Sequence, residues 1–150
     1  MADPKEVRRL QELAFEMRKK LINLCGCYDG IVHIGGDLSM TDLLIGLYHH
    51  GMNVDPKGIK APDRDRFLLS KGHGAVCMYI AMSLRGYFDY DEIVETYGKL
   101  DSAYGMHPCK IQLIGMWLSW TGIIWARLWM PLTIYRPQRL RTRQRSSAAR

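Results

Sequence analysis

Residues 67–85 decide the fold, and they read FLLSKGHGAVCMYIAMSLR. Phe67-Leu68-Leu69 is a short apolar run, which is typical of a buried strand. Ser70-Lys71-Gly72 predicts a turn after this strand. Residues 74–85 are mostly small and apolar, as expected of a helix in a protein core. A buried strand that feeds a turn and then a core helix indicates an α/β fold.

Two helices are predicted before this stretch. The first covers residues 5–25, where apolar side chains recur at helical spacing. These side chains are Leu10, Leu13, Ala14, Met17, Leu21 and Leu24. The second covers residues 40–50 and stops at Gly51, and Ser39 followed by Asp42 approximates a capping box at its start.

A loop and a further helix complete the predicted elements. Residues 52–65 are rich in Pro, Gly and Asp and predict a surface loop. Its end, Asp63-Arg64-Asp65-Arg66, alternates in sign, so we expect a solvated, salt-bridged loop rather than a nucleic-acid patch. Asp89 and Glu92 open a helix that ends near Gly98.

The composition is that of a globular domain. The chain has 150 residues, of which 47% are hydrophobic and 24% charged, so it fits one domain. Its charged start leads into an amphipathic helix, so we expect no signal peptide and a cytoplasmic location. The cysteines show no Cys-x-x-Cys spacing, which favours buried thiols over a disulfide frame or a zinc site. They are Cys25, Cys27, Cys77 and Cys109.

The net charge of +6 is divided unevenly along the chain. Residues 1–110 hold 14 Lys and Arg against 15 Asp and Glu, whereas residues 111–150 hold seven Arg, no Lys and no acid. All four tryptophans also lie in residues 111–150. The chain therefore joins two different compositions near residue 115.

Three histidines lie in glycine-containing turns: His33 in HIGGDLS, His73 in SKGHG and His107 in GMHP. Glycine lets backbone approach a ligand closely, and imidazole donates hydrogen bonds and moves protons near neutral pH. His73 also precedes a helix, where backbone N–H groups and the helix dipole favour an anion. These features predict a site that holds a phosphate and moves protons. The alternative for each is a capping, turn or loop histidine, and we interpret His49 and His50, at a helix end where positive charge is favourable, as structural.

Six segments carry a resemblance to a known family. In order they are HIGG-x-LS (33–39), MNVDP (52–56), PDRDRF (62–67), SKGH (70–73), GYF (86–88) and GMHP (105–108). Over about residues 5–115 the chain resembles the amino-terminal part of transketolases. The similarity is greatest to the split type, whose two halves are separate chains.

The resemblance implies a fold, a cofactor and a reaction. The fold is a parallel sheet wrapped by helices, of which this chain holds the opening helices and the first strand. The reaction is the thiamine-diphosphate-dependent transfer of two-carbon ketol units between sugar phosphates, as in pentose phosphate metabolism. His73, Gly72 and Gly74 would contact the diphosphate, and His33 and His107 would be catalytic residues at the substrate. A transketolase C-terminal half or subunit would be the partner, in a homo- or hetero-oligomer.

The sequence leaves the family pattern near residue 115. Ile114 stands where the family has proline, and the pattern is lost from Met116 onward. The family's Gly-Asp-Gly, whose aspartate holds magnesium, does not occur, and no acid follows Asp101. We therefore expect the magnesium ligands to be absent and the chain to be inactive alone. Residues 1–115 would be a partial diphosphate-binding domain, and residues 116–150 a Trp- and Arg-rich tail of unassigned structure.

Three interpretations of the tail stay open. It is an out-of-frame continuation, a membrane-interface segment over residues 111–126, or an arginine cluster over residues 136–145 that binds nucleic acid. The uncharged run falls short of the roughly twenty residues that a membrane span needs. The alternative function is thus a non-catalytic interaction module whose tail binds a membrane surface or an anionic partner. Our main expectation is a sugar phosphate substrate, with no nucleic acid and no membrane.

Overall fold

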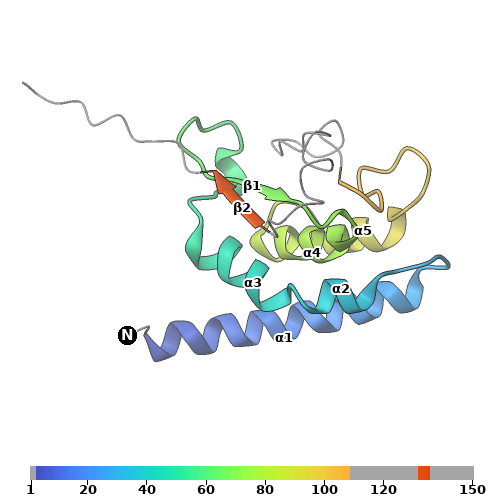
Figure 1. Ribbon diagram of the computed structural model, residues 1–150, viewed down its shortest axis with the longest axis horizontal. Coiled ribbons are helices and arrows are strands. Elements are labelled where there is room, and N and C mark those ends of the chain that lie inside the picture. Colours follow the sequence, from blue (N-terminus) through green and yellow to red (C-terminus); the bar gives the residue numbers. More distant parts are fainter. Residues whose placement is uncertain (1–2, 109–131, 136–150) are drawn as a thin grey trace, which may run out of the picture.

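The computed structural model describes residues 3–108 and 132–135, and Figure 1 shows its helices and strands. The long helix α1 (Pro4–Cys27) lies along one side of the described part. The two short helices α2 (Ile34–Leu38) and α3 (Thr41–Gly46) pack against it. The described residues are therefore mostly helical, as expected.

Helix α1 forms for local reasons that the sequence already contains. The Asp3 side chain accepts a hydrogen bond from Lys5 N at 3.0 Å, and Pro4 lies in the first turn, where its missing N–H breaks no helical bond. The buried face consists of Ala14, Met17, Leu21 and Leu24. This confirms the helix predicted for residues 5–25.

After α3 the chain continues as a wider helical turn, η1 (Leu47–Gly51), so the second predicted helix is confirmed in extent. The predicted capping box is wrong. The Ser39 hydroxyl donates to Gly36 O at 2.7 Å, and Asp42 pairs with Arg18 of α1 instead of capping its own helix. A contact between two helices has replaced the local one.

Strand β1 (Arg66–Leu69) confirms the predicted strand, and its side chains alternate between half-buried and buried. It pairs with β2 (Leu132–Tyr135) in antiparallel register, with Arg66 opposite Tyr135. The expected parallel sheet is therefore not what the described residues form. Parallel pairing needs a crossover that returns the chain in the same direction, whereas β2 runs opposite to β1.

The core is centred on helix α4 (Ala75–Arg85), which contacts α1, α2 and α3. The first eight residues of α4 are each at most 4% exposed. The helix ends at Gly86, whose φ of 94° lies in the left-handed region that favours glycine. Helix α5 (Tyr90–Thr96) follows. Both predicted helices are confirmed.

The loop between η1 and β1 contains one short turn, η2 (Pro56–Gly58), and is less solvated than predicted. Asp65 is only 2% exposed. Its Oδ2 accepts from Asn53 N at 2.8 Å, and its own N donates to Asn53 O at 2.9 Å. Arg64 Nε donates to Ile59 O at 2.6 Å. The expectation of a solvated loop is wrong for Asp65, because hydrogen bonds within the loop compensate for its burial.

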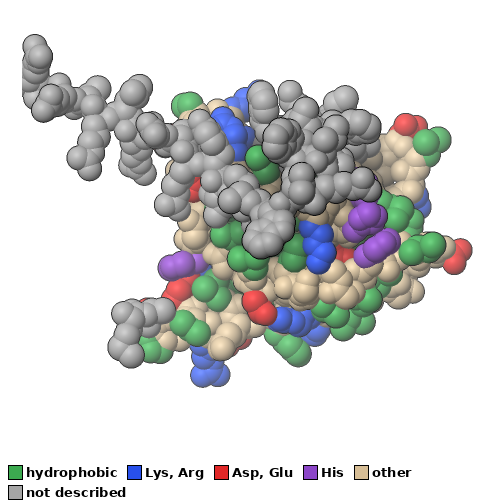
Figure 2. Space-filling view, in the orientation of Figure 1, with side chains coloured by type: hydrophobic (Ala, Val, Ile, Leu, Met, Phe, Trp, Pro, Cys, Tyr) green, Lys and Arg blue, Asp and Glu red, His purple; other side chains and the backbone are tan. Residues whose placement is uncertain are grey.

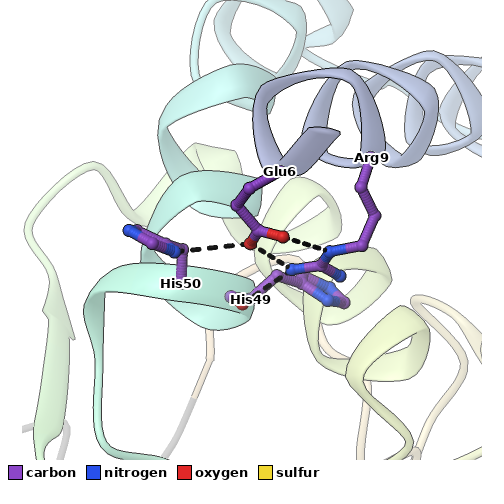
Figure 3. Close-up of polar contacts among 4 residues, drawn as sticks. All are labelled: Glu6, Arg9, His49 and His50. Atoms are coloured by element: carbon purple, nitrogen blue, oxygen red, sulfur yellow. Dashed lines mark hydrogen bonds and ion pairs between the residues drawn. The ribbon is translucent and has the colours of Figure 1, made fainter. Parts of the chain in front are cut away.

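Figure 3 shows a charged cluster that joins α1 to η1. The Glu6 carboxylate accepts from Arg9 Nε at 2.9 Å and lies 3.3 Å from His50 Nδ1, and Arg9 also donates to His49 O at 3.1 Å. The hydrogen bond from Arg9 lowers the pKa of Glu6 to about 2. Burial lowers the pKa of His49 and so disfavours the positive charge that its place at a helix end suggests.

Most of the tail lies outside the described residues. Of residues 116–150 the structure describes 132–135, so the uncharged run over 111–126 and the arginine cluster over 136–145 are not described. In the part of the chain that is described, no helix is both long and apolar enough to cross a membrane. The three interpretations of the tail stay predictions.

Candidate functional site

A tight turn places His73 at the head of α4. Strand β1 leads through Ser70 and Lys71 into η3 (Gly72–Gly74), which runs directly into the helix. Gly74 N donates to Lys71 O at 2.8 Å and closes the turn. The His73 side chain is exposed there. The predicted succession of strand, turn and helix is confirmed.

His33 reaches the same place from α2. It is the residue before the first turn of that helix, and its carbonyl accepts from Gly36 N at 2.9 Å and Asp37 N at 3.3 Å. Its ring lies beside the ring of His73, with centroids 4.5 Å apart and planes at 34°. Two imidazoles that are distant in the sequence are thus in contact.

His107 also contacts the ring of His73. The two ring centroids are 4.5 Å apart and the planes stand at 90°, so one edge meets one face. The loop of His107 is fastened to the core, because the buried Tyr79 hydroxyl donates to Gly105 O at 2.9 Å. The structure thus brings the three predicted histidines together, with His73 in the centre, and Figure 2 shows histidine side chains gathered on this face.

The histidine cluster, defined as His33, His73 and His107, is open to solvent on all three members. Partial burial lowers the pKa of His107, and the neighbouring rings of His73 and His33 lower it further. Neighbouring groups that can become cations disfavour protonation of the His107 ring. His107 is therefore neutral near pH 7 and is able to accept a proton as well as donate one.

The two predicted glycines have different surroundings. A Cβ at Gly72 would lie 3.4 Å from His107 Cδ2, so a side chain there would touch the histidine cluster. A Cβ at Gly74 would lie 2.1 Å from Met40 Cε, which already fills that space. Gly72 thus lies beside the rings, whereas Gly74 is needed for packing beneath them.

Two charged residues that the sequence analysis did not single out hold this region together. Asp37 is 1% exposed, and its Oδ1 accepts from Cys77 N, in the first turn of α4, at 3.1 Å. The helix end that we expected to attract a ligand anion thus already holds an internal carboxylate. The Lys71 ammonium donates to Gly36 O at 3.1 Å and Ser39 Oγ at 3.2 Å. The sequence signal that could have identified Asp37 is an acidic residue between Gly36 and Leu38 in HIGGDLS.

The described donors do not fit a magnesium ion. Within residues 3–108 and 132–135, no group of three His, Cys, Asp or Glu side chains is arranged to hold a metal. Magnesium requires oxygen ligands, and the buried carboxylate beside the histidine cluster, that of Asp37, is bonded to Cys77 N.

The described cysteines agree in part with the prediction of buried thiols. Burial raises the pKa of the Cys77 thiol to about 12, and nearby Asp37 adds to this shift. Cys25 is half-buried, but Cys27 is exposed, so burial was wrongly predicted for it. Cys109 lies outside the described residues.

Comparison with known proteins gives a consistent result. Residues 28–118 match the family described as transketolase, thiamine diphosphate binding domain. A 6-deoxy-6-sulfo-D-fructose transketolase subunit of Clostridium sp. (strain MSTE9) is 40% identical over 107 residues, which are 71% of this chain and 38% of that protein. An apulose-4-phosphate transketolase subunit of Actinobacillus succinogenes is 36% identical over 115 residues, 77% of this chain and 41% of that protein. A transketolase of Cereibacter sphaeroides is 38% identical over 77 residues, 51% of this chain and 12% of that protein.

The match includes every member of the histidine cluster as well as Asp37 and Lys71. The chain spans about two fifths of the length of the two subunits that it matches. The resemblance inferred from six short segments is confirmed by a match over 28–118. The chain belongs to the family of transketolase thiamine diphosphate binding domains.

Proposed function

We propose that this chain supplies the diphosphate-binding part of a two-chain transketolase, an enzyme that moves two-carbon ketol units between sugar phosphates. The observation that carries the proposal is the contact of three imidazoles at the head of α4, inside the region of the family match. Exposed N–H donors in such a group suit phosphate oxygens. Thiamine diphosphate, when bound, supplies the nucleophilic carbon that takes up the two-carbon unit.

His73 is the diphosphate ligand in this proposal. Its ring is exposed and lies between the other two, so it can donate a hydrogen bond to a phosphate oxygen that approaches the turn. Gly72 leaves room beside the His107 ring for that oxygen. Gly74 acts from below, because Met40 packs into the space of its missing side chain and holds the turn in place.

His33 and His107 act at the sugar. The lowered pKa of His107 keeps its ring neutral near pH 7, so it is able to take a proton from a substrate hydroxyl. His33, whose ring lies beside that of His73, donates a hydrogen bond that orients the sugar. No step of this proposal passes through a magnesium ion, since the described donors do not fit one.

A second chain completes the enzyme in this proposal. Two similar proteins are named as transketolase subunits, and this chain spans about two fifths of their length. We place the cofactor domain in residues 1–115 and the complex in the cytoplasm, and we expect no turnover from this chain alone. The family match stops at residue 118, close to the change in composition, which supports the separation of residues 116–150 from the cofactor domain.

Isothermal calorimetry of the full chain with thiamine diphosphate tests the proposal. We expect weak binding, at least tenfold tighter with the partner subunit present and about tenfold weaker in His73→Ala, since a hydrogen bond to a charged group contributes about 1.5–3 kcal/mol. The control is His50→Ala, which removes an exposed imidazole that pairs with Glu6, away from the histidine cluster, and should leave binding unchanged. Equal affinities of the wild type and His73→Ala would refute the role of His73.

The tail is tested separately by sequencing the coding DNA around codon 116. A shifted reading frame that encodes Gly-Asp-Gly downstream would support an out-of-frame tail. If no frame encodes that motif, the out-of-frame explanation is wrong, whereas the proposal for the histidine cluster is unaffected.

A further inference from the structure

Helix α2 depends on contacts with the rest of the chain for its position. It has five residues, Ile34 to Leu38, two of which are glycines. A helix of this length is not stable by itself in water, because nucleation is unfavourable and glycine has low helix propensity. Since His33 is attached directly to this helix, whatever holds α2 in place also places the His33 ring.

Asp37 makes the buried contacts between α2 and α4. Its Oδ1 accepts from Cys77 N at 3.1 Å, and its carbonyl accepts from Cys77 Sγ at 3.1 Å. The same carbonyl accepts from Met40 N at 3.1 Å and Thr41 Oγ1 at 3.4 Å. Cys77 lies in the first turn of α4, whose N–H groups have no partner within the helix. The Asp37 carboxylate therefore supplies an acceptor that the local sequence of α4 does not.

These contacts link the backbone at His33 to the backbone at His73 through a chain of covalent and hydrogen bonds. Asp37 N donates to His33 O at 3.3 Å, so His33 lies one helical turn before Asp37. On the other side of the link, Cys77 follows His73 by four residues. The bond between Asp37 and Cys77 is therefore one of the links that set the distance between the His33 and His73 rings. On the surface Lys71 adds a second link, from its ammonium to Gly36 O.

We propose that Asp37 is a positioning residue of the histidine cluster: its carboxylate holds α2 on the first turn of α4 and thereby keeps the His33 ring against the His73 ring. This inference deepens the proposed function and rests on it for its catalytic meaning. The geometric claim itself does not require any ligand. The geometric claim about Asp37 and the proposed function can therefore be refuted independently of each other.

The structure provides an internal control. The contact of His73 with His107 involves no residue of α2, because His107 is held by the bond from Tyr79 to Gly105. Loss of the Asp37 acceptor should release His33 and leave the other ring pair in contact. A general loss of structure would instead abolish both contacts.

The experiment is proton NMR of the imidazole rings in the full chain at about pH 8, where imidazoles are neutral. We expect nuclear Overhauser cross-peaks between His33 and His73 and between His73 and His107 in the wild type. Asp37→Ala should lose the first and keep the second. Asp37→Asn should keep both, because its amide oxygen still accepts from Cys77 N. Asp42→Asn, at an exposed position of α3, is the matched control and should keep both.

Two outcomes overturn the proposal. In the first, Asp37→Ala keeps the cross-peak between His33 and His73 at wild-type intensity. In the second, Asp37→Asn loses that cross-peak although it retains the acceptor. If Asp37→Ala does not fold, the wild type decides through hydrogen exchange of the Cys77 amide. Slow exchange that persists in Asp37→Asn, whose amide oxygen still accepts from Cys77 N, supports the bond, and exchange at the rate of an unprotected amide refutes it. Inorganic pyrophosphate added to the same samples reports ligand binding separately, through the His73 ring shifts.

Discussion

The ring of His107 stands at 90° to the ring of His73, with centroids 4.5 Å apart. This contact contributes to the lowered pKa of His107, after partial burial, and His33 adds to the effect. Burial has the largest effect on the His107 pKa, His73 the next largest and His33 the smallest. Removal of His73 removes a neighbouring potential cation and exposes the remaining ring to water.

We therefore expect His73→Ala to raise the pKa of His107 toward its ordinary value of 6.5. The measurement is an NMR titration of the His107 ring protons. His33→Ala should produce a smaller rise, because its contribution is the smaller of the two. His50→Ala should produce none, and an unchanged His107 pKa in His73→Ala would contradict the electrostatic explanation.

Asp37 predicts an unusual dependence of stability on pH. Burial raises its pKa from 3.8 to about 6, whereas the Cys77 N–H and the Lys71 ammonium act in the opposite direction. Between pH 3.8 and about 6, the Asp37 carboxyl therefore holds a proton in the folded chain that it has lost in the unfolded chain. This contribution to stability is complete below pH 3.8 and is lost as the pH rises through about 6.

Asp37→Asn should consequently be more stable than the wild type above pH 6, by about 3 kcal/mol, since each unit of pKa shift corresponds to about 1.4 kcal/mol. The difference should vanish toward pH 4. Urea unfolding at several pH values gives both free energies. The Lys71 ammonium acts on this carboxylate, and the Asp37 charge in turn helps to raise the pKa of Cys77, Cys25 and Tyr97. A stability difference that is independent of pH would exclude Asp37 as its origin.

Gly74 makes a packing prediction. A methyl group there would collide with Met40 Cε, the flexible end of a side chain, so Gly74→Ala should destabilise the fold by about 1 kcal/mol. Met40→Ala should remove that penalty, so the double variant should lose less than the sum of the single changes. Thermal unfolding measures all three.

The matched control is Gly46→Ala, because a Cβ at this helical glycine has no atom within 4 Å. This change should stabilise the fold by about 0.5–1 kcal/mol, as alanine favours helix more than glycine does. If Gly74→Ala behaved like Gly46→Ala, Met40 would not be what excludes a side chain there.

The cluster of Glu6, Arg9 and His50 should respond to salt and to acid. The hydrogen bond from Arg9 lowers the pKa of Glu6 from 4.5 to about 2, so its stabilisation is present above pH 4.5 and is lost as the pH falls toward 2. Glu6→Gln should lower the urea midpoint at low salt and much less at high salt. Glu12→Gln, which breaks an exposed pair with Arg8, should have a smaller effect. Equal effects would show that the cluster adds nothing beyond a surface pair.

The parts of the fold that follow from local pattern were predictable. Helices α1 and α4 have continuous apolar faces, and Gly86 marks the end of α4 by its left-handed conformation. Helix α2 was not predictable, because its two glycines indicate a turn. It is held in place by Asp37, whose partner Cys77 is 40 residues away. The burial of Asp65 was missed for a similar reason, as its partner Asn53 lies in another part of the loop.

The candidate site was predictable in its members and not in its construction. Glycine-flanked histidines marked His33, His73 and His107, and the structure places them in contact. Nothing local shows that Asp37 holds the head of α4 or that Met40 fills the space beside Gly74. Both are tertiary contacts between segments that are distant in sequence, and no periodicity records them. The antiparallel partner of β1 was missed because pairing of strands is equally non-local.

The bond from Tyr79 to Gly105 makes the exposed histidine cluster depend on the interior. Tyr79 is fully buried in the middle of α4, yet its phenol sets the backbone just before Met106 and His107. The substitution Tyr79→Phe preserves volume and hydrophobicity, but it would remove the hydrogen bond that holds the segment leading to the His107 ring. The position of the His107 ring is therefore set from the middle of α4, and a redesign confined to the exposed rim would leave the geometry of that imidazole as it is.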